Sequence, residues 1–112
     1  MAYQTVTPVK LGQGSVAITN TTRYTVPAST RTFVKDITIC NTSNSNTASV
    51  SVYLVPYGNT AAPANLLLSN ISIVPNGVFQ WAGSQIMNAG DFIQDIAIVI
   101  GCTINISGGE AV

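Results

Sequence analysis

The feature that most constrains the fold is the alternation of apolar and polar side chains in short segments separated by turn residues. In one such segment Val50, Val52 and Leu54 fall on one face of an extended chain, and Ser51 and Tyr53 fall on the other. Comparable segments occupy residues 14–19, 23–26, 32–41, 49–57, 66–74, 78–82, 91–100 and 102–107. Eight strands at a spacing of about ten residues predict an all-β fold, an antiparallel β-sandwich or small barrel with Greek-key or jelly-roll-like connections.

The chain is long enough for one domain, because 112 residues can bury sufficient surface to fold alone. We expect residues 14–112 to form this β-sandwich domain and residues 1–13 to form an extended N-terminal arm. The arm contains proline and glycine, with Val6, Val9 and Leu11 as apolar side chains between them. Such an arm can pair its backbone with a neighbouring subunit or a shell surface.

Charge excludes several kinds of partner. Charged residues form only 7% of the chain, and four basic residues balance four acidic ones. A net charge of zero gives no long-range field, so neither nucleic acid nor membrane is expected as a partner. It also removes the repulsion that keeps copies apart, which favours a homo-oligomer. The first residues lack the basic and apolar regions of a signal peptide, so we expect synthesis in the cytoplasm.

The sequence offers little for catalysis, because it contains no histidine, the usual proton-transfer group and commonest metal ligand. Asp91 and Asp95 could form a glycosidase-like pair of carboxylates. We favour a turn-supporting role for Asp91 and a contact with solvent or an arginine for Asp95. Cys40 and Cys102 are expected as small buried thiols on strands, with a disulfide between them as the alternative. We therefore predict a protein that is not an enzyme and holds no metal or cofactor.

Residues 66–68 and 91–100 carry more apolar side chains than one face of a strand needs. One face can pack in the core, and the other is then expected to meet a loop, an arm or another subunit. Trp81 is expected as a core or interface anchor, although with the tyrosines it could form a platform for sugars. The residues predicted to form an interface are Val6, Val9, Leu11, Leu66, Leu67, Leu68 and Trp81.

Four short segments carry a resemblance to a known group of proteins. They are Tyr-Thr-Val-Pro-Ala-Ser-Thr at residues 24–30, Val-Lys-Asp-Ile-Thr-Ile-Cys-Asn at 34–41, Val-Ser-Val-Tyr-Leu-Val at 50–55 and Asn-Ala-Gly-Asp at 88–91. In this respect the chain resembles small structural virion proteins of tailed bacteriophages. The family's turn positions correspond to Pro27, Asn41 and Gly90, which shape the backbone, and the chain departs from the pattern at Ser29, where glycine is frequent.

The resemblance implies a non-enzymatic structural protein, specifically a capsid cement or decoration protein that binds and stabilises the head shell as an oligomer, often a trimer. Its partners would be the major capsid protein or other virion proteins. It would be located in the virion after synthesis in the host bacterial cytoplasm. The alternative is a tail, baseplate or fibre component, which includes a receptor-binding or glycan-binding tip.

Overall fold

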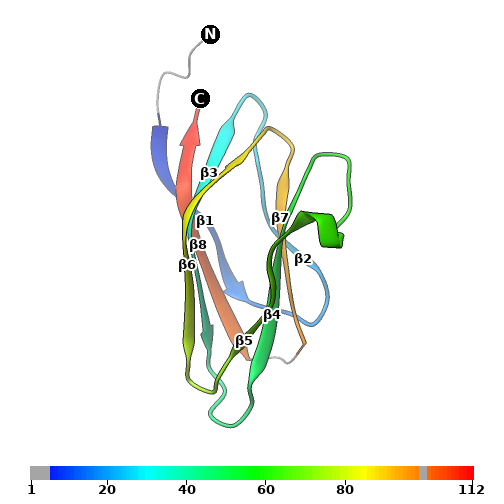
Figure 1. Ribbon diagram of the computed structural model, residues 1–112. Helices are drawn as coiled ribbons and strands as arrows, with labels where there is room; N and C mark the ends of the chain where they lie inside the picture. Colours follow the sequence, from blue (N-terminus) through cyan, green and yellow to red (C-terminus); the bar gives the residue numbers. More distant parts are fainter. Residues whose placement is uncertain (1–5, 99–100) are drawn as a thin grey trace.

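The fold is a sandwich of two antiparallel sheets, seen in a computed structural model that describes residues 6–98 and 101–112 (Figure 1). One sheet has the strand order β1-β8-β3-β6 and the other β2-β7-β4-β5. A single turn of 3-10 helix, Pro63–Asn65, precedes β5. The strands are β1 (Val6–Ser15), β2 (Thr21–Thr25), β3 (Arg31–Asn41), β4 (Ala48–Val55), β5 (Leu66–Ile73), β6 (Val78–Met87), β7 (Phe92–Ala97) and β8 (Cys102–Ala111).

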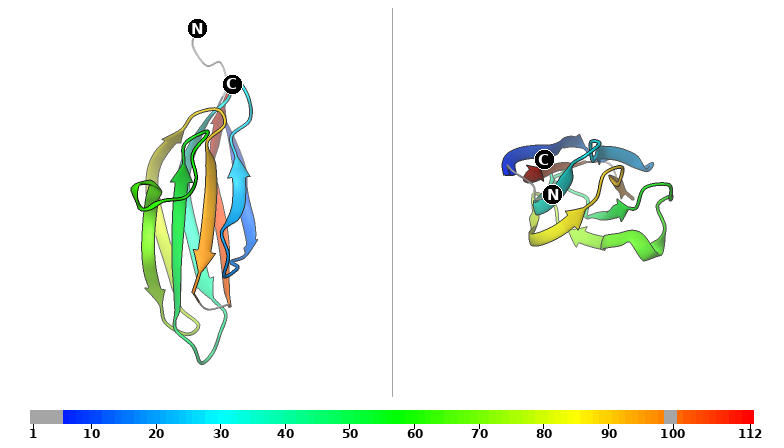
Figure 2. Two further views of the ribbon diagram at one scale, coloured as in Figure 1. Left: turned by 90° about the vertical axis from the view of Figure 1, so that its right-hand side faces the viewer. Right: turned by 90° about the horizontal axis from the view of Figure 1, so that it is seen from above.

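The strand order is that of a jelly roll. The first and last strands, β1 and β8, are neighbours in one sheet, and most connections cross from one sheet to the other. The view from above in Figure 2 shows the two layers facing each other. The predicted all-β sandwich with about eight strands is confirmed.

The core lies between the layers and follows the alternation seen in the sequence. Val50 and Val52 of β4 are fully buried. They belong to one cluster of apolar side chains with Ile37 and Ile39 of β3, which lies in the opposite sheet. Ile93 of β7 belongs to the same cluster. Period-two patterning therefore decides which face of each strand packs inward.

The N-terminal segment differs from the expectation. Residues 6–13 form most of β1, which pairs with β8 from Val6 opposite Ala111 onward. Leu11 is buried in the core and Val9 packs against it, because these two alternate residues face the opposite sheet. The structure therefore places residues 6–13 in the sandwich and not in a separate arm. Residues 1–5 of the predicted arm lie outside the described residues.

Two glycine pairs lie inside strands. Gly12 and Gly14 belong to β1, and a Cβ atom at Gly12 would overlap Cγ of Arg23. Gly108 and Gly109 belong to β8, where a Cβ atom at Gly108 would overlap the backbone carbonyl of Phe33. Close approach of another part of the chain therefore explains glycine at these positions.

The three turn positions taken from the resemblance have structural roles. Asn41 is buried, and its side-chain amide donates hydrogen bonds to the carbonyls of Asn46 and Ile73 at 2.8 and 3.0 Å. Gly90 has a φ of +88°, and Pro27 begins the turn between β2 and β3. Ser29, where the family often has glycine, still adopts the left-handed region with a φ of +56°.

Candidate interaction surfaces

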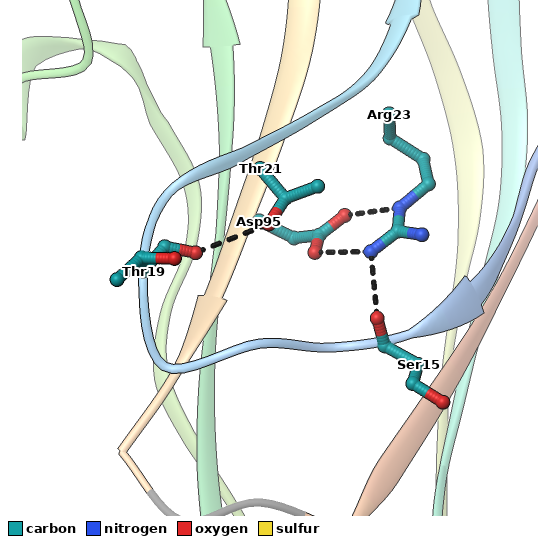
Figure 3. Close-up of polar contacts among 5 residues, drawn as sticks. All are labelled: Ser15, Thr19, Thr21, Arg23 and Asp95. Atoms are coloured by element: carbon teal, nitrogen blue, oxygen red, sulfur yellow. Dashed lines mark hydrogen bonds and ion pairs between the residues drawn. The ribbon is translucent and has the colours of Figure 1, made fainter.

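An ion pair between Arg23 and Asp95 stabilises the fold (Figure 3). Nε and Nη2 of Arg23 donate to the two carboxylate oxygens of Asp95 at 2.8 and 2.7 Å. Nη2 also donates to the carbonyl of Ser15 on β1 at 3.1 Å. Asp95 is fully buried, and hydrogen bonding to it raises the pKa of Arg23. The pair therefore joins β7 and β2 to the other sheet.

A second polar link joins the sheets through Tyr24. Its hydroxyl donates a hydrogen bond to a carboxylate oxygen of Glu110 on β8 and lies 2.7 Å from the hydroxyl of Thr32 on β3. Burial and the hydrogen bond to Glu110 raise the pKa of Tyr24 to about 12. The phenol therefore stays neutral over the ordinary pH range.

The two carboxylates considered as a catalytic pair both have structural partners. Asp95 holds Arg23, as predicted for an arginine contact, and Asp91 accepts hydrogen bonds from the backbone amides of Tyr57 and Asn88, both at 2.9 Å. Asp91 thus supports the turn before β7, as expected. Within residues 6–98 and 101–112 no cluster of three His, Cys, Asp or Glu side chains could hold a metal ion. In the same ranges no helix is long and apolar enough to cross a membrane.

Both cysteines are free thiols. Cys40 pairs in register with Thr103, and Cys102 pairs with Asn41, so the two side chains point to opposite faces of the same sheet. Cys102 is buried, and burial raises the pKa of its thiol. The expected buried strand thiol is therefore found at Cys102, whereas Cys40 is only half-buried, and the alternative disulfide is not formed.

The seven residues predicted as an interface do not form one surface. Leu11 and Leu68 belong to the core, and Val9 and Leu67 pack against it. Val6 is 61% exposed on the outer face of the first sheet. The two remaining residues, Leu66 and Trp81, lie on different sheets and are each half-buried.

Trp81 lies on β6, an edge strand, opposite the buried Ile37 of β3. Residues opposite each other point to the same face of a sheet, so the indole faces the interior at the open flank of the sandwich. There it packs against the core, together with Phe79. This position agrees with an anchor at the edge of the core.

A concave surface lies on the outer face of the sheet β2-β7-β4-β5. It is a groove of about 500 Å³. Its polar side is built around Ser51, whose hydroxyl accepts a hydrogen bond from the amide of Asn70 at 2.9 Å. Asn70 has a φ of +48° at an irregularity of β5, which bends this strand away from β4. The lining residues are Ile18, Ser49, Ser51, Tyr53, Leu66, Ser69, Asn70, Ile96, Ala97 and Ile98.

Of the predicted interface only Leu66 lines this groove. The sequence did contain a signal for some of the other lining residues, because Ser51 and Tyr53 form the polar face of one strand, and residues 91–100 are apolar on both faces. Ile98 is 69% exposed, in agreement with an outward apolar face on this segment. Residues 99 and 100 of this segment lie outside the described residues.

A smaller pocket of about 220 Å³ lies on the outer face of the other sheet. Pro8, Gly109, Phe33 and Ile86 are register partners across its four strands, so a row of apolar groups crosses this face. The pocket is lined by Val6, Pro8, Phe33, Lys35, Gly108 and Gly109. Each outer face of the sandwich therefore offers one partly apolar depression.

Comparison with known proteins gives a likeness of fold alone. No protein-family model matches the sequence, and no curated protein matches it. A chain in the structure of infectious bursal disease virus, Gx strain, has a TM-score of 0.55 at 7% identity, covering 96% of this chain and 32% of that chain. The VP2 subviral particle of the same virus gives 0.57 at 7% identity, covering 96% and 32%. Its T13 viral particle gives 0.52 at 8% identity, covering 96% and 30%. This chain thus spans about a third of the length of these virus-particle chains and shares the fold of the part that it matches.

Proposed function

We propose that this protein is a non-enzymatic structural component of a virus particle. The observation that carries the proposal is the jelly roll itself, which matches chains of virus particles over 96% of its length. Jelly rolls are common in viral capsid and lectin domains. The charged side chains described above support this role, since Arg23, Asp91 and Asp95 are engaged in holding the fold.

The finer proposal is a cement or decoration protein on the head shell of a tailed bacteriophage, where it acts as an oligomer, with a trimer as the expected form. The sequence resemblance supports this assignment. Two further features agree with it: partly apolar depressions on both outer faces, and a net charge of zero that lets copies and shell surfaces approach closely. The shell protein would be the main partner.

Copy number and position test this proposal. Particles purified from the virus that encodes the chain should contain it in a fixed, high ratio to the major shell protein, measured by quantitative mass spectrometry. Antibody labelling in electron micrographs should decorate the head, and particles lacking the protein should lose their contents at a lower temperature. A few copies at the tail would favour a tail, baseplate or fibre component. Absence from purified particles would contradict both assignments.

The groove favours one form of the alternative, a glycan-binding tip. It combines hydroxyl and amide groups of Ser51 and Asn70 with the ring of Tyr53, and no charged side chain is among the described residues that line it. Such a lining suits a neutral sugar, which offers hydroxyl groups and an apolar face. A glycan array tests this form. Binding that disappears in Tyr53→Ala and persists in Tyr57→Ala would support a tip, because Tyr57 is 78% exposed and lies outside the groove. Loss only in Trp81→Ala would point to the flank of β6.

A further inference from the structure

The sandwich has open strand edges on both flanks, and three of the four described edge strands are interrupted. β1 carries Pro8 and Lys10 and has an irregular register after Lys10. β2 has only five residues, includes Arg23 and is irregular beside it. β5 is broken at Asn70, as described for the groove. Proline, charge, shortness and bulges are the usual means of preventing edge-to-edge pairing.

The fourth edge strand, β6, has an uninterrupted first half. Residues 78–82 pair with β3 in regular register, from Val78 opposite Cys40 to Ala82 opposite Asp36. The whole strand Val78–Met87 contains no charged residue and no proline. A register shift follows at Lys35 of β3, so the regular edge ends at Ala82. Figure 2 shows β6 along the flank of the sandwich that it shares with β5.

The direction of the backbone groups in this half of β6 follows from one hydrogen bond. The amide of Asn41 donates to the carbonyl of Gly77 at 2.9 Å. In an antiparallel pair alternate residues bond to the same neighbour, so Phe79 and Trp81 direct their backbone groups to β3. The backbone groups of Val78, Gln80 and Ala82 then point outward, where a strand from another chain can pair with them.

We propose that this edge binds a second copy of the same chain, with residues 78–82 of the two copies antiparallel about a two-fold axis at Gln80. Three outward residues placed symmetrically about a central one make the segment self-complementary, which a two-fold contact requires. Gln80 then pairs with Gln80 of the second copy, and Val78 pairs with Ala82. The lack of charge on β6 leaves no like-charge repulsion across this contact.

The same register brings aromatic rings together. Phe79 of one copy lies opposite Trp81 of the other, in the closer, non-hydrogen-bonded type of pair. Both side chains face inward at the flank and are only half-buried in the single chain. The contact would therefore cover the apolar surface that the open flank leaves exposed, and it would join two four-stranded sheets into one of eight strands. It does not depend on a role in a virus particle.

Light scattering on the purified protein tests the proposal. We expect the wild type to have twice the chain mass of 11.7 kDa, or an even multiple if a trimer contact exists elsewhere. Gln80→Pro removes an outward amide and should yield the dissociated mass with the β signal in circular dichroism retained, because proline is tolerated where an edge amide faces solvent. Gln80→Ala is the matched control: it loses the same side chain, including its 2.5 Å hydrogen bond to Asp36, yet keeps the amide and should remain associated.

A crosslink tests the register independently of folding effects in the proline variant. In a Cys40→Ala background, Gln80→Cys should form a disulfide-linked dimer on mild oxidation, since residues paired across strands lie within disulfide reach. Gln13→Cys, at an exposed position of β1 away from this edge, should form no disulfide-linked dimer under the same conditions. A wild type with the mass of one chain or three chains, or equal crosslinking of the two cysteine variants, would overturn the proposal.

Discussion

Arg23 and Asp95 form a bidentate ion pair in the interior, and the same guanidinium reaches the carbonyl of Ser15 on the opposite sheet. The carboxylate is fully buried and the arginine side chain is 10% exposed. A buried charge is stable only with its partner, so each member of this pair requires the other.

Arg23→Ala should therefore lower the free energy of unfolding by about 3–5 kcal/mol, because it leaves the Asp95 carboxylate buried without a counter-charge. Urea denaturation followed by circular dichroism measures the change. Lys10→Ala, at an exposed site, is the control and should change stability by less than about 1 kcal/mol. The double variant Arg23→Met, Asp95→Leu should recover much of the loss. A loss as small as that of Lys10→Ala would contradict a buried role for the pair.

Gly12 should be coupled to Arg23, because any Cβ atom there would overlap the arginine side chain. We expect Gly12→Ala to destabilise the protein by about 1–3 kcal/mol through this overpacking. In an Arg23→Ala background the overlap is gone, and the penalty should largely disappear. A double-mutant cycle from four urea curves gives the coupling energy. Equal penalties in the two backgrounds would show that Gly12 is required for some other reason.

The strands themselves could be predicted from the sequence, because period-two patterning is a local signal. The segment 49–57 shows this, since Val50 and Val52 enter the core as the alternation requires. The start of β1 could not be predicted correctly: the expected strand begins at residue 14, whereas β1 begins at Val6. Glycines in this segment resemble a loop in the sequence, and their close contact with Arg23 is seen only in the structure. That contact joins two strands of different sheets, and no local pattern reports it.

The surfaces could be predicted only in part, for a similar reason. The outward apolar residues of segment 91–100 could be predicted from the sequence. The groove also depends on the bend of β5 at Asn70 and on the hydroxyl of Ser51, which accepts a hydrogen bond from the amide of Asn70. The partner of Asp95 could be named as an arginine but not as Arg23, which is 72 residues away. Pairings of this kind depend on which strands become neighbours.

Ser29 provides a test of backbone strain. Its φ of +56° lies in the left-handed region, which costs an L-residue about 1–2 kcal/mol, whereas glycine adopts it freely. Glycine also gains freedom in the unfolded chain, so Ser29→Gly should stabilise the protein by a net of about 0.5 kcal/mol. Thermal denaturation should show a rise of about 2–4 °C. Ser29→Ala, which keeps the Cβ atom, should show no rise, and a lower melting temperature for Ser29→Gly would contradict the strain.

Tyr24 should make the fold sensitive to alkali. Its pKa rises from an ordinary value of about 10 to about 12 in the folded protein, through burial and the hydrogen bond to Glu110. Because the fold favours the neutral phenol, this contribution to stability is complete below about pH 10 and is lost as the pH rises through about 12. Urea curves at several pH values should therefore show a stability difference between wild type and Tyr24→Phe that shrinks over this range. Tyr57→Phe, at an exposed ring, is the control and should follow the wild type. A stability difference between wild type and Tyr24→Phe that stays constant up to about pH 12 would contradict the raised pKa of Tyr24 in the folded protein.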